Sequence, residues 1–108
     1  MAITTVKGAP VTAFATHATS AVATITGVTG AVNYITDIAG SSDKAGSLLT
    51  VKQGTTVIWE VQLAATAAGN LTFCQSFVSP LASASGASVS VTVDGTSLCK
   101  ANIAGYQL

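Results

Sequence analysis

The sequence predicts an all-β protein, a jelly-roll-like antiparallel β-sandwich of about eight strands with an extended N-terminal arm. Three observations support this fold class. β-Branched Thr and Val dominate, no stretch of convincing length has a helical period, and Gly, Ser and Asn recur as turn signals roughly every eight to twelve residues. At 108 residues, the chain should form one domain around one core, without metal or disulfide staples.

The chain begins with a segment that is not typical of a sandwich strand. Residues 1–10 contain Gly8 and Pro10, so we expect them to form an extended arm or a short edge strand. The sandwich domain is then predicted to cover residues 11–108. No internal repeat, linker or second domain is evident.

The first strands of the sandwich are predicted at Val11–Thr16 and Ala21–Thr26. Alanine is abundant in this region, and a helix over about residues 13–24 is the main alternative. The threonines of the region argue against it, because they are poor helix residues. Residues 31–40 are predicted as the next strand, which ends at Gly40.

The clearest local pattern is a β-hairpin in which Ser47–Lys52 and Thr55–Leu63 are joined by Gln53-Gly54. The second arm alternates between apolar and more polar positions. Its inward face is predicted to carry Val57, Trp59, Val61 and Leu63, and its outward face Thr56, Ile58, Glu60 and Gln62. Because Trp59 shares the apolar face, we expect it to anchor the core.

Three further strands complete the prediction: residues 71–77, which Pro80 should end, and then residues 88–94 and 98–108. The middle one of these alternates valine with Ser and Thr, so its valines should face inward. Asp94-Gly95 is a strong hairpin signal, which predicts a tight turn into the last strand. The order of the strands within the sheets does not follow from these patterns.

The surface should be unusually poor in charge. Charged residues make up 7% of the chain, against about 25% in an average soluble domain, and the formal net charge is zero. One interpretation is a small β-protein with a neutral surface. We favour a second, in which partner chains cover much of the surface. Charges are depleted from interface cores, and a free monomer near zero charge tends to self-associate.

Several partners are disfavoured. The only basic residues are the scattered Lys7, Lys44, Lys52 and Lys100. Nucleic-acid binding needs clustered positive charge, so none is expected. A membrane-spanning helix is not expected either, since no run of about 18 apolar residues lacks Thr, Gly or a charge. The N-terminus has a proline where a signal core should begin, so we expect the protein to be made and kept in a cytoplasm until assembly.

The two cysteines, Cys74 and Cys99, are too few for a disulfide framework or a four-ligand zinc site. They could pair if their strands are neighbours. A reducing compartment favours the alternative, in which both are free, buried thiols that pack as small apolar residues.

Candidate catalytic groups are few. No local motif joins the one histidine, His17, to a serine and an acid, so we expect it to be structural or solvated. The four acids fall in separate elements. The sequence therefore indicates no pair of carboxylates that would hydrolyse a sugar, and no loop with the several acids that calcium prefers. These acids are Asp37, Asp43, Glu60 and Asp94. Asp43 and Asp94 should bond backbone in turns. We expect no enzymatic activity, no cofactor and no metal site.

Two segments, YITDIAGSSDKAGSLLTVKQGTTVIWEV and GASVSVTVDGTSLCKANIAGYQL, resemble small virion proteins of tailed bacteriophages. The shared pattern is a strand, a loop of small residues and an LT-V-K-x-G-T-T-V hairpin. A late G-A-x-V-S-V strand and a terminal GY strand follow. The resemblance covers about residues 32–63 and 86–108, which is well over half of the chain.

The resemblance implies a capsid decoration (cement) protein. Such a protein is a β-sandwich, commonly a homotrimer, that binds the outer surface of the icosahedral head and clamps subunits of the major capsid protein. It implies a place on the virion after synthesis in the cytoplasm of the host bacterium. The arm could add a strand to a capsid-protein sheet edge, and its candidate contact residues are Ile3, Thr4, Thr5, Val6 and Lys7.

Two other functions stay open at this point. A phage tail or fibre module that binds a host surface glycan should carry exposed aromatic residues around a groove. A small carbohydrate-binding or hydrolytic sandwich should have a cleft with converging acids near Trp59 or Tyr106. Tyr34, Tyr106 and Trp59 could each stack on a sugar, although Trp59 is the expected core anchor.

Overall fold

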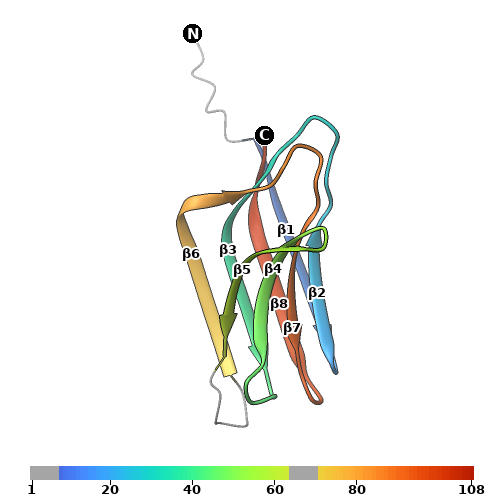
Figure 1. Ribbon diagram of the computed structural model, residues 1–108, viewed down its shortest axis with the longest axis vertical. Helices are drawn as coiled ribbons and strands as arrows, with labels where there is room; N and C mark the ends of the chain where they lie inside the picture. The colour runs from blue at the N-terminus through green and yellow to red at the C-terminus, as the bar shows by residue number, and fades with distance from the viewer. Residues whose placement is uncertain (1–7, 64–70) are drawn as a thin grey trace.

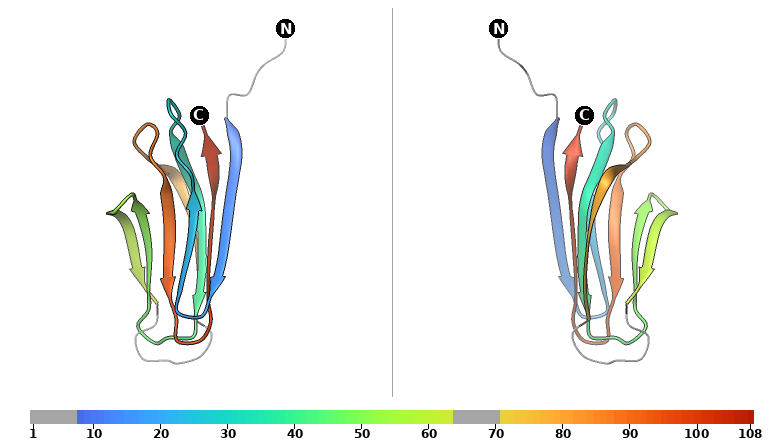
Figure 2. Two further views of the ribbon diagram at one scale, coloured as in Figure 1. Left: turned by 90° about the vertical axis from the view of Figure 1, so that its right-hand side faces the viewer. Right: turned by 90° about the vertical axis from the view of Figure 1, so that its left-hand side faces the viewer.

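Two four-stranded antiparallel sheets pack face to face (Figures 1 and 2). The structure is a computed structural model and describes residues 8–63 and 71–108. Its strands are β1 (Ala9–His17), β2 (Ser20–Ile25), β3 (Asn33–Ser42), β4 (Leu48–Gln53), β5 (Thr56–Gln62), β6 (Leu71–Ala82), β7 (Val89–Asp94) and β8 (Cys99–Gln107). The order is β1-β8-β3-β6 in sheet A and β2-β7-β4-β5 in sheet B. This is a jelly-roll order, and the predicted all-β sandwich is confirmed.

The core lies between the two sheets and is built by strand alternation. The valines of β7 face inward as predicted, and all three are fully buried. They meet apolar side chains from the inner face of sheet A. The largest fully buried apolar side chains are Ile35, Leu49, Val51, Val89, Val91, Val93 and Ile103.

The predicted hairpin is present as β4 and β5, with its turn one residue later than expected. Gln53 pairs with Thr56, so the turn residues are Gly54 and Thr55. Gly54 has a φ of 60°. A positive φ at the first turn residue is what a type II′ turn needs, and glycine adopts it without steric cost.

A β-bulge changes which side chains of β5 face the core. Val51 pairs with Trp59, but the next residue, Lys52, pairs with Val57, which leaves Ile58 as an extra residue. Ile58 is therefore half-buried against the core, and Val57 is 49% exposed. The predicted inward Val57 and outward Ile58 were both wrong, because the bulge reverses the alternation at this point.

Pro80 does not end the strand that contains it. The pairing of β6 with β3 runs to Ser76 opposite Asp37 and resumes at Leu81 opposite Ile35. The residues between form an irregular bend, which Figure 1 shows near one end of β6. β6 is an edge strand, where a proline is tolerated because its missing N–H costs no ladder hydrogen bond.

The Asp94-Gly95 signal does not make a hairpin. β7 belongs to sheet B and β8 to sheet A, so residues 95–98 cross from one sheet to the other. The hydroxyls of Ser42 and Ser47 both donate to the backbone oxygen of Asp94, and they hold the crossing in place.

The last two residues of the predicted arm, residues 1–10, belong to β1. β1 begins at Ala9, and Ala9 and Pro10 pair with Gln107 and Tyr106 at the edge of sheet A. This agrees with the edge-strand alternative for the end of the segment, because an edge position accommodates Pro10.

Asp43 ties the β3–β4 loop to the β7–β8 crossing. Its carboxylate accepts hydrogen bonds from the backbone N–H groups of Thr96 (2.7 Å), Ser97 (2.9 Å) and Leu98 (3.1 Å), and from the Ser97 hydroxyl. The predicted turn role of Asp43 is thus confirmed. The Ser97 hydroxyl and these N–H groups hold the pKa of the carboxyl well below its usual range, because they favour its charged form.

We expect Asp43→Asn to lower the melting temperature at neutral pH. The folded pKa lies below the ordinary value of 3.8, so the stabilisation is complete above about pH 3.8 and is lost as the pH falls towards the folded pKa. The difference in melting temperature between the two proteins should therefore shrink in acid. Circular-dichroism melts across this pH range test it. Lys44→Gln, which changes a neighbouring charge, is the matched control, and an equal effect of both variants would contradict the role of Asp43.

Candidate functional site

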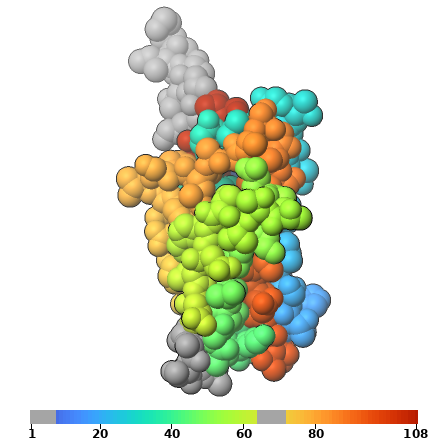
Figure 3. All heavy atoms as spheres, viewed as in Figure 1, coloured from blue at the N-terminus to red at the C-terminus, as the bar shows by residue number. Residues whose placement is uncertain are grey.

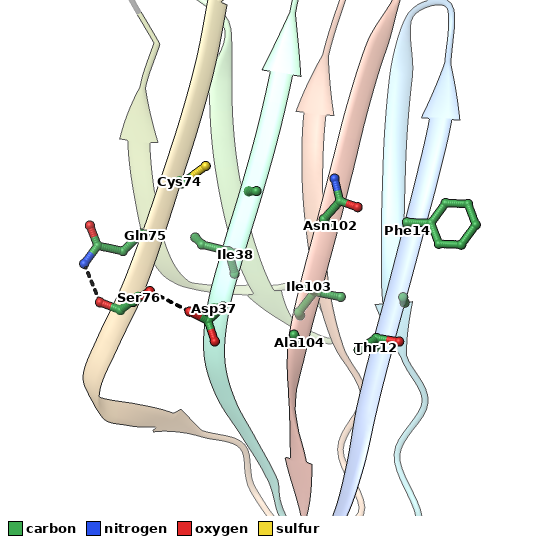
Figure 4. Close-up of a pocket in the computed structure, with 12 residues that line it drawn as sticks. Thr12, Phe14, Asp37, Ile38, Cys74, Gln75, Ser76, Asn102, Ile103 and Ala104 are labelled. Carbon is green, nitrogen blue, oxygen red and sulfur yellow. Dashed lines mark hydrogen bonds between the residues drawn. The ribbon is translucent and has the colours of Figure 1, made fainter.

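A shallow depression crosses the outer face of sheet A, over β1, β8, β3 and β6 (Figure 4). Residues directly opposite each other in antiparallel strands share a face. The register places two rows side by side: Thr12, Ala104, Asp37 and Ser76, and Phe14, Asn102, Ala39 and Cys74. Each row has an alanine between larger side chains, and these two alanines leave the surface hollow.

Asp37 is the charged residue of the depression. Its Oδ1 accepts a hydrogen bond from Ser76 Oγ at 2.6 Å, and its Oδ2 accepts one from Thr36 Oγ1 at 2.9 Å. These two hydroxyls, that of Ser76 first, lower the pKa of the carboxyl. The carboxylate is therefore ionised at neutral pH and fixed in direction. Since a carboxylate offers about four acceptor positions, it can still accept hydrogen bonds from a ligand.

Thr36 reaches Asp37 because β3 is irregular at this point. The register of β3 against both of its neighbours shifts between Ile35 and Asp37, and Thr36 is the extra residue. The bulge re-aims the adjoining side chains, which is a frequent feature of strands at functional sites.

Asn102 lies in the other row and is exposed to solvent. It is diagonal to Asp37, since Ala104 is the residue directly opposite Asp37 on the same strand as Asn102. Figure 4 shows no hydrogen bond from Asn102 to the other residues drawn, and its amide has both donors and an acceptor. A carboxylate and an amide thus face the same hollow.

Aromatic side chains flank the depression on the same face. Tyr34 and Tyr106 are opposite each other on β3 and β8, with stacked rings whose centroids are 5.0 Å apart and whose planes differ by 17°. They form the next row beyond Thr12 and Asp37. Phe14 is 81% exposed on the edge strand β1. The tyrosine pair thus lies beyond one end of the depression and Phe14 lies at its β1 edge.

Trp59 lies elsewhere, on the inner side of β5. Its ring makes an edge contact with Phe77 at 5.5 Å between centroids and a tilted contact with Phe73 at 5.9 Å. The side chain is half-buried and packs against the core, joining the edge of sheet B to the β6 edge of sheet A. Its position is at the margin of the core, and it does not contribute to the depression.

The other sequence-predicted groups do not converge. His17 Nδ1 accepts hydrogen bonds from the backbone N–H groups of Thr19 (3.1 Å) and Ser20 (3.2 Å), which shapes the β1–β2 connection. Glu60 accepts a hydrogen bond from Thr50 on the outer face of sheet B. Across residues 8–63 and 71–108, no group of His, Cys, Asp and Glu side chains could hold a metal ion. The candidate contacts Ile3, Thr4, Thr5, Val6 and Lys7 lie outside the described residues.

The two cysteines differ in environment and do not pair. Cys99 is buried, its Sγ donates to the backbone oxygen of His17 at 3.3 Å, and burial raises the pKa of its thiol. Cys74 is exposed, so the prediction of two buried thiols was wrong for this residue. Thr72, Cys74 and Ser76 alternate to the outer face of β6, and β3 separates the strands of the two cysteines.

The depression itself was missed in the sequence. Asp37 points outward because of the bulge at Thr36, which alternation does not predict, and Asp37 and Asn102 are 65 positions apart in the chain. Only the order β8-β3-β6 makes them neighbours, and no local pattern encodes that order.

No family model matches the sequence, and no curated protein matches it. Among solved structures, dimeric latent PorU from Porphyromonas gingivalis is similar over 91% of this chain, with 7% sequence identity and a TM-score of 0.32. The chain spans 13% of the length of that protein. A similarity this weak carries no argument. Within the described residues, no helix is long and apolar enough to cross a membrane.

Proposed function

We propose that the chain is a bacteriophage capsid decoration protein. In this role it binds the outer surface of the icosahedral head and stabilises contacts between subunits of the major capsid protein. The proposal rests on the resemblance of residues 32–63 and 86–108 to small virion proteins and on one structural observation. That observation is the outer face of sheet B, where exposed aliphatic side chains lie among mostly neutral polar residues, with Lys52, Glu60 and Asp94 as its charges.

Exposed aliphatic side chains lie on three strands of sheet B, whose outer face is toward the viewer in Figure 3. Val22 on β2 is 50% exposed, Val57 on β5 is 49% exposed, and Leu48 on β4 is 39% exposed. Val57 faces outward because of the bulge at Ile58. The bulge therefore adds apolar surface to this face at the edge of the sheet.

The residues between these aliphatic side chains are mostly neutral. The register aligns Val22 with Thr92, Thr50 and Glu60 in one row, and Thr24 with Ser90, Lys52 and Val57 in the next. Lys52 and Glu60 are the charges of these two rows. Low charge is typical of the centre of an interface, where ions would have to lose their water.

A capsid shell is the occupant that we assign to this face. A decoration protein meets the same capsid surface many times, so weak contacts from each copy add up by multivalency when the copies are joined. A homotrimer would do this through closed cyclic symmetry. In the proposal, the segment before β1 adds a strand to a capsid-protein sheet edge.

Co-sedimentation with emptied phage heads that lack this protein tests the proposal. We expect the chain to bind, and Val22→Asp and Val57→Asp each to weaken binding about tenfold or more, because each buries an unpaired charge. Thr16→Asp, on the outer face of sheet A, is the matched control and should bind normally. Size-exclusion chromatography should give three times the 10.6 kDa chain mass.

Two results would overturn the proposal: a monomer that ignores the heads, or undiminished binding by both sheet B variants. A chain lacking residues 2–7 tests the arm in the same assay while leaving β1 intact, since β1 begins at Ala9. Retained binding by that chain would remove the arm from the interface without affecting the assignment of sheet B.

A further inference from the structure

We propose that the depression on the outer face of sheet A binds a neutral sugar residue, such as one in a cell-surface glycan, through Asp37, Asn102 and the flanking tyrosines. This site goes beyond capsid decoration and uses the opposite face of the sandwich. It rests on three features of the depression: its charge, its hydrogen-bonding groups and its apolar surface.

The charge of the depression disfavours anions. Asp37 is the charged residue among those that line it, and its carboxylate is ionised at neutral pH. A phosphate, a nucleic acid or an acidic sugar would meet this charge, because the lining holds no lysine and Lys100 lies on the far side of the Asn102 row from Asp37. A neutral ligand avoids that repulsion.

The polar groups fit a ligand that carries hydroxyls. The ionised Asp37 accepts hydrogen bonds, and two protein hydroxyls hold it in a fixed direction. Asn102 can both donate and accept. As diagonal neighbours on adjacent strands, the two lie about 7–8 Å apart at the backbone, and their side chains can approach one ring from both sides. Thr12 adds a further hydroxyl at the β1 side.

The apolar part of the lining fits the flat face of a sugar ring. Ala39 and Ala104 leave room for a ring to approach the sheet closely. The stacked Tyr34 and Tyr106 extend this surface by one row. Because their ring faces lie against each other, they offer a ligand in the depression their apolar ring edges and polar hydroxyls. Few, well-placed polar groups on a mostly apolar hollow are typical of small-molecule sites.

The two faces of the sandwich can work independently. Figure 2 shows the sheets as separate layers. The depression lies on the outer face of the sheet formed by β1, β8, β3 and β6. If sheet B rests on a capsid, sheet A faces away from it. A decorated head would then present many copies of the sugar site to its surroundings, and weak single sites would combine by multivalency.

NMR titration of the ¹⁵N-labelled protein tests the site. The probes are the methyl glycosides of glucose, galactose, mannose and N-acetylglucosamine, each raised to tens of millimolar. We expect at least one of them to cause saturable shifts of amide signals around Asp37, Ser76 and Asn102, with sheet B unchanged. The methyl glycoside of sialic acid, which is anionic, should bind more weakly than the best neutral sugar.

Variants decide whether the polar groups bind the sugar. Asp37→Asn and Asn102→Ala should each reduce the affinity for the sugar about tenfold or more. Asp37→Asn weakens a hydrogen bond that the sugar donates to a charged carboxylate, and Asn102→Ala removes the hydrogen bonds of the amide. Thr24→Ala, at an exposed position on the outer face of sheet B, should leave the affinity unchanged. Asn102 is exposed, so its variant should fold even if Asp37→Asn does not.

The inference is overturned if none of the four neutral sugars gives saturable shifts, if the shifts cluster on sheet B, or if Asn102→Ala binds as well as the unaltered chain. Tighter binding of the sialic acid glycoside would overturn the neutral-sugar assignment. The head-binding assay separates the two proposals, because Asn102→Ala should still bind heads. Sugar binding by a chain that ignores heads would instead favour a tail or fibre module.

Discussion

Replacement of Leu49 by alanine should lower the free energy of unfolding by about 2–5 kcal/mol. Leu49 is completely buried at the centre of β4, between the strands β7 and β5. Its side chain fills the space above Gly40 of the opposite sheet, where an added Cβ would lie 2.7 Å from Leu49 Cδ1. Two hydrogen-bonded neighbours hold β4 in place, so the cavity cannot close.

The adjacent residue supplies a matched control for this prediction. Leu48 points outward from the same strand and is 39% exposed. Leu48→Ala removes the same atoms but leaves no cavity, and we expect it to cost about 1 kcal/mol or less. Urea unfolding followed by circular dichroism measures both. Equal losses for the two leucines would mean that β4 does not alternate as the structure shows.

Gly105→Ala should be at least as damaging, and we expect a loss of about 3 kcal/mol or more. A Cβ at this position would lie 2.0 Å from the backbone oxygen of Tyr34 and 3.0 Å from Cα of Ile35. These are backbone atoms of β3, which cannot rotate away as a side chain could. Relief requires β3 and β8 to separate at the middle of sheet A, beside the bulge at Thr36.

Gly30→Ala separates this steric effect from the loss of glycine's conformational freedom. Gly30 has a φ of +83°, but nothing lies within 4 Å of an added Cβ. Its cost should be the backbone strain alone, about 1–2 kcal/mol. Thermal melts of the two variants provide the test. A Gly105 variant as stable as the Gly30 variant would show that sheet A tolerates the added methyl group.

The fold class was predictable from the sequence because strand alternation is a local property. The alternating valines of β7 predict a half-buried strand from that segment alone. The β4–β5 hairpin is likewise predicted locally, because its two strands and its turn are contiguous in the sequence. The exceptions are positions where a neighbouring strand imposes an irregularity. Ile58 faces inward because of its pairing with β4, and Pro80 lies within β6 because that strand is at an edge.

The strand order and the depression were beyond sequence reasoning for one physical reason. Both depend on which distant segments pair, and β1 pairs with β8 from the opposite end of the chain. Asp94-Gly95 illustrates the difficulty. The dipeptide favours a hairpin locally, but the hydroxyls of Ser42 and Ser47 bind Asp94 where the chain crosses between sheets. A strong local signal was overridden by long-range packing.

The strand order also governs how the chain can fold. Among the eight described strands, β4 and β5 alone are neighbours both along the chain and within a sheet. Every other pairing must close a long loop before it gains any stability, which is slow, and comparable all-β domains fold in milliseconds to seconds. On the ribosome, β1 has to wait for β8, its one neighbour in sheet A, and β8 is synthesised after the other seven described strands. We therefore expect the hairpin to form first and sheet A to be completed only after β8 has been synthesised.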